Sequence, residues 1–343
     1  MRRFRKPGDI KVGVIGYGAA FNMGRVHLSE MQKAGMVPVA VAELDPARRQ
    51  AAQQDFPGIQ TYPSVRDLLR KSDVHLVTII TPHNTHARLA LQCLNAGRHV
   101  VCEKPFAINT AECDAMIAAA RRRGLLLSTY HNRHWDGWIL QAVKTVRSGA
   151  LGDLVRVAVH MGGWAKPRDW WRSRRSITGS ILHDWGVHAL EYTLQVVNDE
   201  IREVSGFVHS GFWARQCPWK EDTIEDEASV TVRYASGVWS LLTMSNLEHR
   251  SRPFWMEITG TLGTYSFNPE AWELVTHRGD RAATTRGKNP PAEYWRFYQN
   301  IADCLTGRAR LVITPEWARR PIHIIDLALQ SARRGRALPA RYP

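Results

Sequence analysis

The chain is poor in cysteine and lacks long apolar runs. Its five cysteines are odd in number, and no two of them form a CxxC pair. That pattern argues against a disulfide framework and against a structural zinc site. No apolar run approaches the ~20 residues that are needed to cross a bilayer. We therefore expect no membrane-spanning segment and no membrane partner.

The start of the chain lacks the pattern of an export signal. The first eight residues are basic, but the apolar stretch that follows is interrupted by glycine and is typical of a strand. It resembles neither the apolar core of a signal peptide nor a twin-arginine signal. We expect a cytoplasmic protein.

Acidic residues are too few to balance the basic ones. The chain has 46 Lys and Arg against 32 Asp and Glu, which gives a formal net charge of +14. Such a charge is compatible with a nucleic-acid partner, with acidic ligands, or with a solvated basic surface. The arginine clusters are scattered, and no helix-turn-helix, zinc-finger or RNP signature accompanies them. We predict no nucleic-acid partner.

The length and the first part of the chain indicate two domains and an α/β fold. A chain of 343 residues exceeds what one α/β core usually needs. Apolar runs alternate with helical patterns, which predicts a doubly wound parallel sheet with helices on both faces over residues 1–128. We expect strands at 10–15, 36–42, 74–80, 99–102 and 125–129, a helix at 86–96, and a helix from a cap at Asn109 or Thr110 to Gly124.

The pattern changes after residue 128. Consecutive strand patterns separated by Gly, Pro and polar turns predict a largely antiparallel sheet within an α/β domain over residues 129–343. We expect its strands at 155–161, 203–209, 228–233, 237–244, 255–259 and 264–267. A last helix follows Thr314-Pro315-Glu316, and it could pack back on the first domain.

The first apolar run ends in a glycine loop that could hold a dinucleotide pyrophosphate. In a GxGxxG fingerprint the first two glycines allow a tight turn and a close approach of backbone to phosphate, and the third lets helix and strand pack closely. Here the third position is Phe21. We interpret the loop as enlarged, with Gly24 as the displaced third glycine. The predicted cofactor-binding residues of this loop are Gly16, Tyr17, Gly18, Ala19, Ala20, Phe21 and Asn22.

A carboxylate at the end of the second strand favours NAD. Glu43 lies about 25 residues past Gly18, where it would accept hydrogen bonds from the adenosine ribose. It would repel the 2′-phosphate of NADP. Arg48 and Arg49 could restore NADP binding, but we interpret them as exposed helix charge, so NADP is the less favoured cofactor.

Two further segments offer groups for moving a proton beside a nicotinamide ring. Glu103-Lys104-Pro105 ends a predicted parallel strand, and Asp184 precedes His188 by one helical turn. His188 is the predicted base for a substrate hydroxyl, because imidazole titrates near neutral pH. Asp184 could bind a hydroxyl or orient the imidazole, and Lys104 could hydrogen-bond the reacting oxygen. Glu103 could pair with Lys104 or lie near the nicotinamide ribose.

Each of these groups also has a structural interpretation. A Lys-Pro at a strand end is usually only a turn, and an Asp/His pair on a helix is usually a local hydrogen bond. His183 beside Asp184 could suggest a metal site with His188, but positions i, i+1 and i+5 do not share a helix face. We predict no metal. The order and spacing of the glycine loop, the Glu103-Lys104-Pro105 segment and the Asp184-to-His188 segment make a nicotinamide-dependent oxidoreductase the leading prediction.

These segments resemble the Gfo/Idh/MocA family of sugar and cyclitol oxidoreductases along nearly the whole chain. The EKP segment and the D-x-G-x-H segment are the most specific. The enlarged glycine loop and Thr178-Gly179-Ser180 depart from the pattern of many relatives. The similar segments are Thr81-Pro82-His83-Asn84-Thr85-His86, Ala96 to Pro105, Ser148-Gly149-Ala150-Leu151-Gly152-Asp153, Asp184-Trp185-Gly186-Val187-His188 and Ser331-Ala332-Arg333-Arg334-Gly335.

The resemblance implies several further features. The first domain would be a Rossmann dinucleotide-binding domain. The second would be a substrate-binding α/β domain with a large open mixed sheet, whose exposed face forms homodimer or homotetramer contacts. The Lys104-Pro105 bond would be cis, as in many relatives. Thr81, Pro82, Asn84, His86 and Glu103 would lie near the cofactor, although His86 could equally cap a helix. Asn132 and Arg133 would reach the cofactor or the substrate.

Tryptophan is abundant, with 13 residues. Trp164, Trp171 and Arg172 fall just before the Asp184 segment. Aromatic faces stack on the C–H faces of sugars, and Arg can bind hydroxyls or carboxylates, but plain core packing is an equal alternative for any one Trp. These residues are predicted to bind substrate, and they favour a bulky polyhydroxylated molecule such as a glycoside.

Three functions therefore remain open from the sequence. The first is an NAD-dependent dehydrogenase of a secondary hydroxyl in a sugar, sugar derivative, glycoside or cyclitol. The second is a glycoside-cleaving enzyme that uses bound NAD transiently, by oxidation, elimination and re-reduction. The third is a non-catalytic NAD-dependent sensor with the same fold, which the presence of Lys104, Asp184 and His188 argues against.

Overall fold

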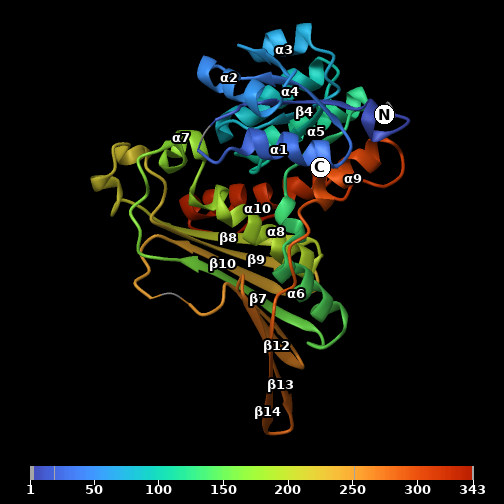
Figure 1. Ribbon diagram of the computed structural model, residues 1–343. Helices are drawn as coiled ribbons and strands as arrows, with labels where there is room; N and C mark the ends of the chain where they lie inside the picture. The colour runs from blue at the N-terminus through green and yellow to red at the C-terminus, as the bar shows by residue number, and fades with distance from the viewer. Residues whose placement is uncertain (1–3, 19, 251, 342–343) are drawn as a thin grey trace. The chain divides into compact units, whose positions relative to one another are not determined.

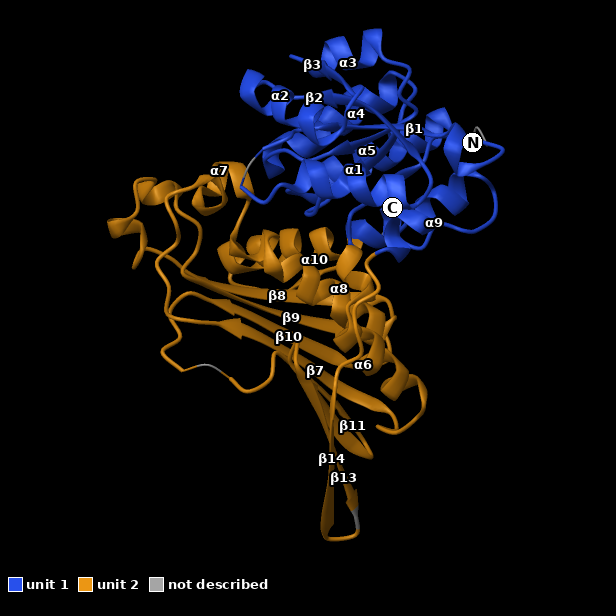
Figure 2. Ribbon diagram, viewed as in Figure 1, with its two compact units in different colours: residues 1–131, 295–319 blue, residues 132–294, 320–343 orange. Residues whose placement is uncertain are grey.

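The computed structural model describes residues 4–18, 20–250 and 252–341, and the chain divides into two compact units. Unit 1 comprises Met1–His131 and Trp295–Arg319, and unit 2 comprises Asn132–Tyr294 and Arg320–Pro343 (Figure 2). The first division falls after residue 131, compared with the predicted 128. The last helix was expected to be able to pack back on the first domain; the segment that belongs to unit 1 is Trp295–Arg319, which contains only the first residues of that helix.

Unit 1 contains a sheet with helices packed around it (Figure 1). The described part of this sheet has six strands in the order β3-β2-β1-β4-β5-β6. Its strands are β1 (Lys11–Ile15), β2 (Val37–Ala42), β3 (Gln60–Tyr62), β4 (Leu76–Ile79), β5 (His99–Cys102) and β6 (Leu127–Thr129). All the pairings are parallel. The predicted Rossmann fold is confirmed.

The helices of unit 1 begin and end where local chemistry favours it. Asn109 caps α5 by accepting a hydrogen bond from the Glu112 backbone N–H, and Gly124 ends it with a φ of 62°. The helices are α1 (Met23–Lys33), α2 (Pro46–Asp55), α3 (Val65–Lys71), α4 (His86–Asn95), α5 (Thr110–Arg123) and α9 (Arg296–Leu305), with short 3-10 turns η1 (Pro7–Asp9) and η2 (His83–Thr85).

The strand order places a switch point between β1 and β4. From β1 the chain moves outward through β2 and β3, and from β4 it moves in the opposite direction through β5 and β6. Right-handed crossovers in opposite directions put their helices on opposite faces of the sheet. Ligands of such sheets bind at the carboxyl ends of the strands beside the switch point. The turns after β1, β2, β4 and β5 are therefore the ones that matter for function.

Unit 2 contains a mixed sheet whose described part has nine strands in the order β14-β13-β12-β11-β7-β10-β9-β8-β15. The strands are β7 (Leu154–Gly162), β8 (Ile201–His209), β9 (Glu227–Tyr234), β10 (Trp239–Ser245), β11 (Met256–Gly260), β12 (Gly263–Phe267), β13 (Ala271–Arg278), β14 (Arg281–Lys288) and β15 (Leu338–Pro339). β7 and β10 pair in parallel and the other pairings are antiparallel. This confirms the expected mixed, mostly antiparallel sheet.

Helices α6, α8 and α10 cover one face of this sheet (Figure 2). Gly206 on β8 lies against α10, where an added Cβ would sit 2.1 Å from the Ala328 carbonyl oxygen. Gly186 on α8 lies near β10, where an added Cβ would be 3.7 Å from Leu242 Cδ2, an ordinary contact distance. The helices are α6 (Gly137–Arg147), α7 (Arg175–Thr178), α8 (Trp185–Val197) and α10 (Pro315–Arg334), with 3-10 turns η3 (Asn132–Trp135), η4 (Trp171–Ser173), η5 (Ile181–His183), η6 (Ala214–Gln216) and η7 (Lys220–Asp222).

The hairpin of β13 and β14 was not predicted. It extends away from the rest of unit 2 (Figure 2), and β14 is exposed along almost its whole length. A strand with no buried face has no alternation of apolar and polar residues to reveal it. Among the described residues, no helix is both long and apolar enough to cross a membrane.

Candidate active site

The turn after β1 brings backbone close to the neighbouring strand. Gly16 has a φ of 97°, and a Cβ there would sit 2.3 Å from the Ile80 carbonyl oxygen. Only glycine fits this position. At Gly18, by contrast, a Cβ would meet nothing within 4 Å. The loop therefore presents bare backbone to open space at Gly18, which fits the approach of a pyrophosphate.

The rest of the loop is longer than in the usual fingerprint, as predicted. It continues to Asn22, which has a φ of 50° and directly precedes α1. A Cβ on Gly24 would sit 2.5 Å from the Tyr17 ring and 3.1 Å from the Gly16 carbonyl oxygen, so Gly24 provides the close packing of a third glycine. Ala20 and Phe21 are exposed, with 51% of Phe21 accessible. Ala19, also a predicted cofactor contact, lies outside the described residues.

Glu43 follows β2 and faces the glycine loop. Its carboxylate accepts hydrogen bonds from the backbone N–H groups of Tyr17 at 2.6 Å and Asp45 at 3.0 Å. Each carboxylate oxygen has room for a second donor, so the group can still accept from a ribose hydroxyl. The Arg49 guanidinium donates to the backbone carbonyls of Glu43 and Leu44, both at 2.8 Å. It therefore helps to hold this turn.

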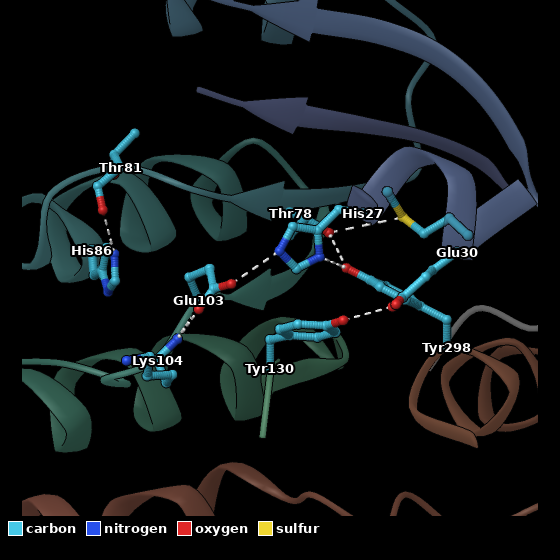
Figure 3. Close-up of polar contacts among 10 residues, drawn as sticks. His27, Glu30, Thr78, Thr81, His86, Glu103, Lys104, Tyr130 and Tyr298 are labelled. Atoms are coloured by element: carbon cyan, nitrogen blue, oxygen red, sulfur yellow. Dashed lines mark hydrogen bonds and ion pairs between the residues drawn. The ribbon is translucent and has the colours of Figure 1, made fainter. Parts of the chain in front are cut away.

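The turn after β4 is tied to the turn after β5 by one buried histidine. His86 is fully buried, and its Nδ1 lies 2.8 Å from the Pro105 carbonyl oxygen. Its Nε2 lies 2.8 Å from the Thr81 carbonyl oxygen (Figure 3). Burial lowers the pKa of His86 below its ordinary value, although both carbonyls act to raise it. Because both nitrogens are engaged, any effect of this ring on a cofactor would act through the two turns. Pro82 and the exposed Asn84 lie in the turn after β4.

Glu103-Lys104-Pro105 follows β5, and the Lys104-Pro105 bond is cis, as the family resemblance implied. The Glu103 carboxylate accepts from the Lys104 backbone N–H at 2.8 Å and lies 3.1 Å from His27 Nε2 (Figure 3). Burial acts to raise the pKa of Glu103. The hydrogen bond and charge of His27 and the charge and backbone N–H of Lys104 outweigh it, so this pKa lies below its ordinary value.

The predicted acid–base pair lies at the start of α8 in unit 2. Asp184 immediately precedes the helix, and His188 lies in its first turn with 4% of its surface exposed. The Asp184 carboxylate accepts a hydrogen bond from Arg172 Nη1 at 3.0 Å. The structure thus joins the predicted substrate residue Arg172 to the predicted catalytic residue Asp184.

Arg133 and His188 both lie beside the ring of Trp185. The Arg133 guanidinium lies 4.6 Å from the centre of the Trp185 ring, and the His188 ring lies 5.5 Å from the same tryptophan. A cation over an indole face is attracted by the ring. Trp185 was quoted as part of a motif but was given no role in the sequence analysis.

Asp136 anchors Arg133 and was missed by the sequence analysis. Its buried carboxylate accepts hydrogen bonds from the hydroxyls of Tyr192 and Tyr294 and lies 3.4 Å from Arg133 Nη1. Burial raises the pKa of Asp136, while these donors oppose the rise. The tyrosines are 56 and 158 residues away in sequence, so no local pattern could have revealed the cluster.

The other predicted substrate residues are more dispersed within unit 2. Asn132 opens η3 beside Arg133. Trp171 packs near Arg172, whose guanidinium lies 5.2 Å from the ring centre. Trp164 is 47% exposed and stacks on His249 with ring centres 4.0 Å apart. The structure records no direct contact between Trp164 and Asp184 or His188 among the interactions that it describes.

Two histidines near α8 hydrogen-bond to neighbouring side chains. His183 Nδ1 lies 2.8 Å from the Ser180 hydroxyl, and His134 Nδ1 lies 2.5 Å from the buried Glu191 carboxylate. Within residues 4–18, 20–250 and 252–341, no three His, Cys, Asp or Glu side chains are grouped as for a metal ion. All five cysteines are buried, and none of them forms a disulfide.

Unit 1 has a Rossmann sheet with a glycine loop after β1 and an acidic residue after β2. Unit 2 has a mixed sheet and a helix, α8, whose start carries Asp184 and His188. Together these features define an oxidoreductase of the dinucleotide-binding class. Residues 10–131 match the oxidoreductase family described as an NAD-binding Rossmann fold, and residues 139–266 match the GFO/IDH/MocA C-terminal domain. The chain belongs to the Gfo/Idh/MocA oxidoreductase family.

Two dehydrogenases match most of this chain at low sequence identity. The chain is 24% identical to scyllo-inositol 2-dehydrogenase (NADP(+)) IolW of Bacillus subtilis over 97% of both chains. It is 26% identical to levoglucosan dehydrogenase of Pseudarthrobacter phenanthrenivorans over 83% of this chain and 82% of that one. The solved structure of the oxidoreductase YvaA from Bacillus subtilis superposes with a TM-score of 0.86 at 22% identity, covering 99% of this chain and 100% of that one. The structural likeness supports the fold.

Proposed function

We propose that the protein is an NAD-dependent oxidoreductase that transfers hydride between nicotinamide and a secondary hydroxyl of a sugar, sugar derivative, glycoside or cyclitol. The observation that carries this proposal is the start of α8, where Asp184 is paired with Arg172 and His188 follows one turn later. The family and the named inositol and levoglucosan dehydrogenases support a polyol substrate. NAD, when bound, supplies the hydride acceptor.

His188 is the proposed base. An imidazole can accept the hydroxyl proton at neutral pH and return it in the reverse direction. Asp184 would accept a hydrogen bond from a substrate hydroxyl, and Arg172 fixes the orientation of its carboxylate. Lys104 would donate a hydrogen bond to the reacting oxygen and stabilise negative charge on it.

Residues of unit 1 would hold the cofactor. The backbone at Gly16 and Gly18 and the start of α1 suit the pyrophosphate, since helix N-termini favour anions. The Glu43 carboxylate suits the adenosine ribose and disfavours a 2′-phosphate, so we propose NAD over NADP. The turns after β4 and β5 would lie toward the nicotinamide half, through Thr81, Pro82, Asn84 and Glu103.

Residues of unit 2 would hold the rest of the substrate. Arg133 is held against Trp185 by the Asp136 carboxylate. Together with Asn132, Trp171 and Trp164 it offers hydrogen-bond donors and aromatic faces suited to a polyhydroxylated ring. The partner we propose is therefore a small carbohydrate or glycoside.

The uncovered sheet face of unit 2 is the proposed surface for self-association. Gly206 faces α10, so its neighbour Phe207 points to the opposite face, where 67% of it is exposed. Trp239 lies on this face as well, with Arg156 5.7 Å from its ring. Exposed aromatics on a sheet face are typical of an interface. Light scattering should report a dimer or tetramer, and a monomer at micromolar concentration would contradict this part of the proposal.

A substrate panel tests the enzymatic proposal. The protein is incubated with NAD and with cyclitols, anhydrosugars, free sugars and aryl glycosides, and both NADH absorbance and remaining substrate are measured. Formation of NADH with a member of the panel supports the dehydrogenase. Loss of a glycoside without net NADH would select the transient-NAD mechanism. Lys104→Met should abolish turnover, whereas Lys144→Met, the same change at an exposed position on α6, should not.

A further inference from the structure

A chain of hydrogen bonds runs from the Glu103 carboxylate into the core of unit 1. His27 on α1 lies 3.1 Å from Glu103 through Nε2 and 2.7 Å from the Tyr298 hydroxyl through Nδ1. The Tyr298 hydroxyl lies 3.0 Å from Thr78 Oγ1 on β4. His27, Thr78 and Tyr298 are at most 1% exposed, and all four residues belong to unit 1 (Figure 3).

The chemistry of Glu103 fixes one end of this chain. An ionised carboxylate only accepts hydrogen bonds, so His27 Nε2 carries a hydrogen and donates it. The lowered pKa of Glu103 agrees with an ionised carboxylate. The Tyr298 and Thr78 hydroxyls can each donate or accept, so the far side of the chain is satisfied whether His27 is neutral or protonated. In both states His27 Nε2 donates to the Glu103 carboxylate.

The chain does not lead to solvent. Beyond Tyr298 it ends at Thr78, whose hydroxyl oxygen lies 3.8 Å from the Met31 sulfur. A thioether cannot carry a proton onward, so the chain is not a path for proton release. What remains is an orienting role: a buried imidazole, itself held by a buried hydroxyl, keeps the Glu103 carboxylate in one position. Residues that hydrogen-bond to a functional side chain in this way hold it in the orientation that its reaction requires.

We propose that His27 and Tyr298 are positioning residues that fix the Glu103-Lys104-Pro105 turn and thereby the Lys104 amine. The inference rests on the proposed function of Lys104. Glu103 is the link, because one of its oxygens accepts from His27 and the other from the Lys104 backbone N–H. Tyr298 comes from the segment that returns to unit 1, 271 residues from His27 in sequence. That return segment is therefore part of the site, although it contains no recognisable motif.

The same cluster offers a matched control. Tyr130 packs against the His27 ring with ring centres 4.3 Å apart, and its hydroxyl donates to Glu30 at 2.6 Å. It is buried like Tyr298, but its hydroxyl bonds to no member of the chain (Figure 3). Tyr298→Phe and Tyr130→Phe each remove one buried hydroxyl from one cluster. Only the first substitution breaks the chain.

The first measurement compares the turnover of these variants. Tyr298→Phe should lower kcat by about 10- to 100-fold, the range expected when a reacting group is misplaced, with little change in substrate KM. Tyr130→Phe should keep the parental kcat even if both variants lose similar thermal stability. Thr78→Val, one hydrogen bond further from Glu103, should lose less than Tyr298→Phe. Equal kcat in the two tyrosine variants would overturn the inference.

The second measurement needs no substrate. Lysines are reductively methylated with ¹³C in the protein without cofactor, and the Lys104 signal is assigned by its loss in Lys104→Met. Tyr298→Phe should shift or broaden that signal, and Tyr130→Phe should not. If the parent protein has no activity, the proposed function is refuted, but the Lys104 signal can still be measured in the two tyrosine variants. An unchanged Lys104 signal in Tyr298→Phe would overturn the inference even in an active dehydrogenase.

Discussion

Replacing Gly18 with alanine should separate cofactor binding from folding. A Cβ at this position would meet nothing within 4 Å, and the φ of Gly18 lies outside the left-handed region. Alanine therefore fits, and the free energy of unfolding should stay level or rise by about 0.4–1 kcal/mol, because the unfolded chain loses freedom. The added methyl group would, however, stand where the pyrophosphate is proposed to approach the backbone. The dissociation constant for NAD should rise at least about tenfold, equivalent to about 1.4 kcal/mol.

Replacing Gly24 with alanine should instead lower the stability of the fold. Its Cβ would sit 2.5 Å from the Tyr17 ring, which is buried and anchored to Asp55 by a 2.7 Å hydrogen bond. The ring cannot easily move aside, so Gly24→Ala should cost about 1–3 kcal/mol of unfolding free energy. Chemical denaturation measures stability, and titration calorimetry measures NAD binding. Gly8→Ala, where the nearest atom is 3.9 Å away, is the control. Parental NAD affinity in Gly18→Ala would refute the assigned pyrophosphate site.

Three further predictions follow from the proposed site. Glu43→Ala should narrow the difference between NAD and NADP dissociation constants, since it removes the charge that repels a 2′-phosphate; tighter NADP binding by the parent protein would overturn the assignment of NAD. His188→Ala should lower turnover by about 10²–10⁴ and leave NAD affinity nearly unchanged; a variant that turns over at the parental rate would show that another group is the base. The pKa of Glu103 is lowered in the folded protein, so its contribution to stability is present above its ordinary value of 4.5 and is lost as pH falls below it. Acid titration of unfolding free energy should therefore show a steeper loss below that pH in the parent than in Glu103→Gln, and identical slopes would contradict this reasoning.

Local signals in the sequence were sufficient for most of unit 1. Of the two caps expected for this helix, Asn109 and Thr110, the structure has Asn109, whose side chain accepts from the Glu112 backbone N–H in the first turn. The Thr314 hydroxyl likewise accepts from the Trp317 backbone N–H at 3.1 Å at the start of α10. Strands β1, β2, β4 and β5 lie within the predicted runs, since each is apolar and bounded by turn residues.

What the sequence did not reveal depends on contacts between distant segments. Tyr298 reaches His27, and Tyr294 reaches Asp136, only after the chain has folded back. Neither tyrosine lies in a motif. The sequence does not distinguish a tyrosine whose hydroxyl hydrogen-bonds in the core from a tyrosine that only packs there. His86 shows the same limit: its position in a family motif is visible, but its two backbone carbonyl partners are not.

Transfer of a labelled hydride tests the proposed function most directly. The protein is incubated with unlabelled NAD and with cyclitols and sugars that carry deuterium on their carbinol carbons, and the nicotinamide pool and the recovered sugars are analysed by mass spectrometry. The proposed function predicts one deuterium on NADH from at least one member of the panel, and loss of that transfer in both Lys104→Met and His188→Ala. Absence of deuterium from NADH across the panel, or transfer that survives in both variants, would contradict it.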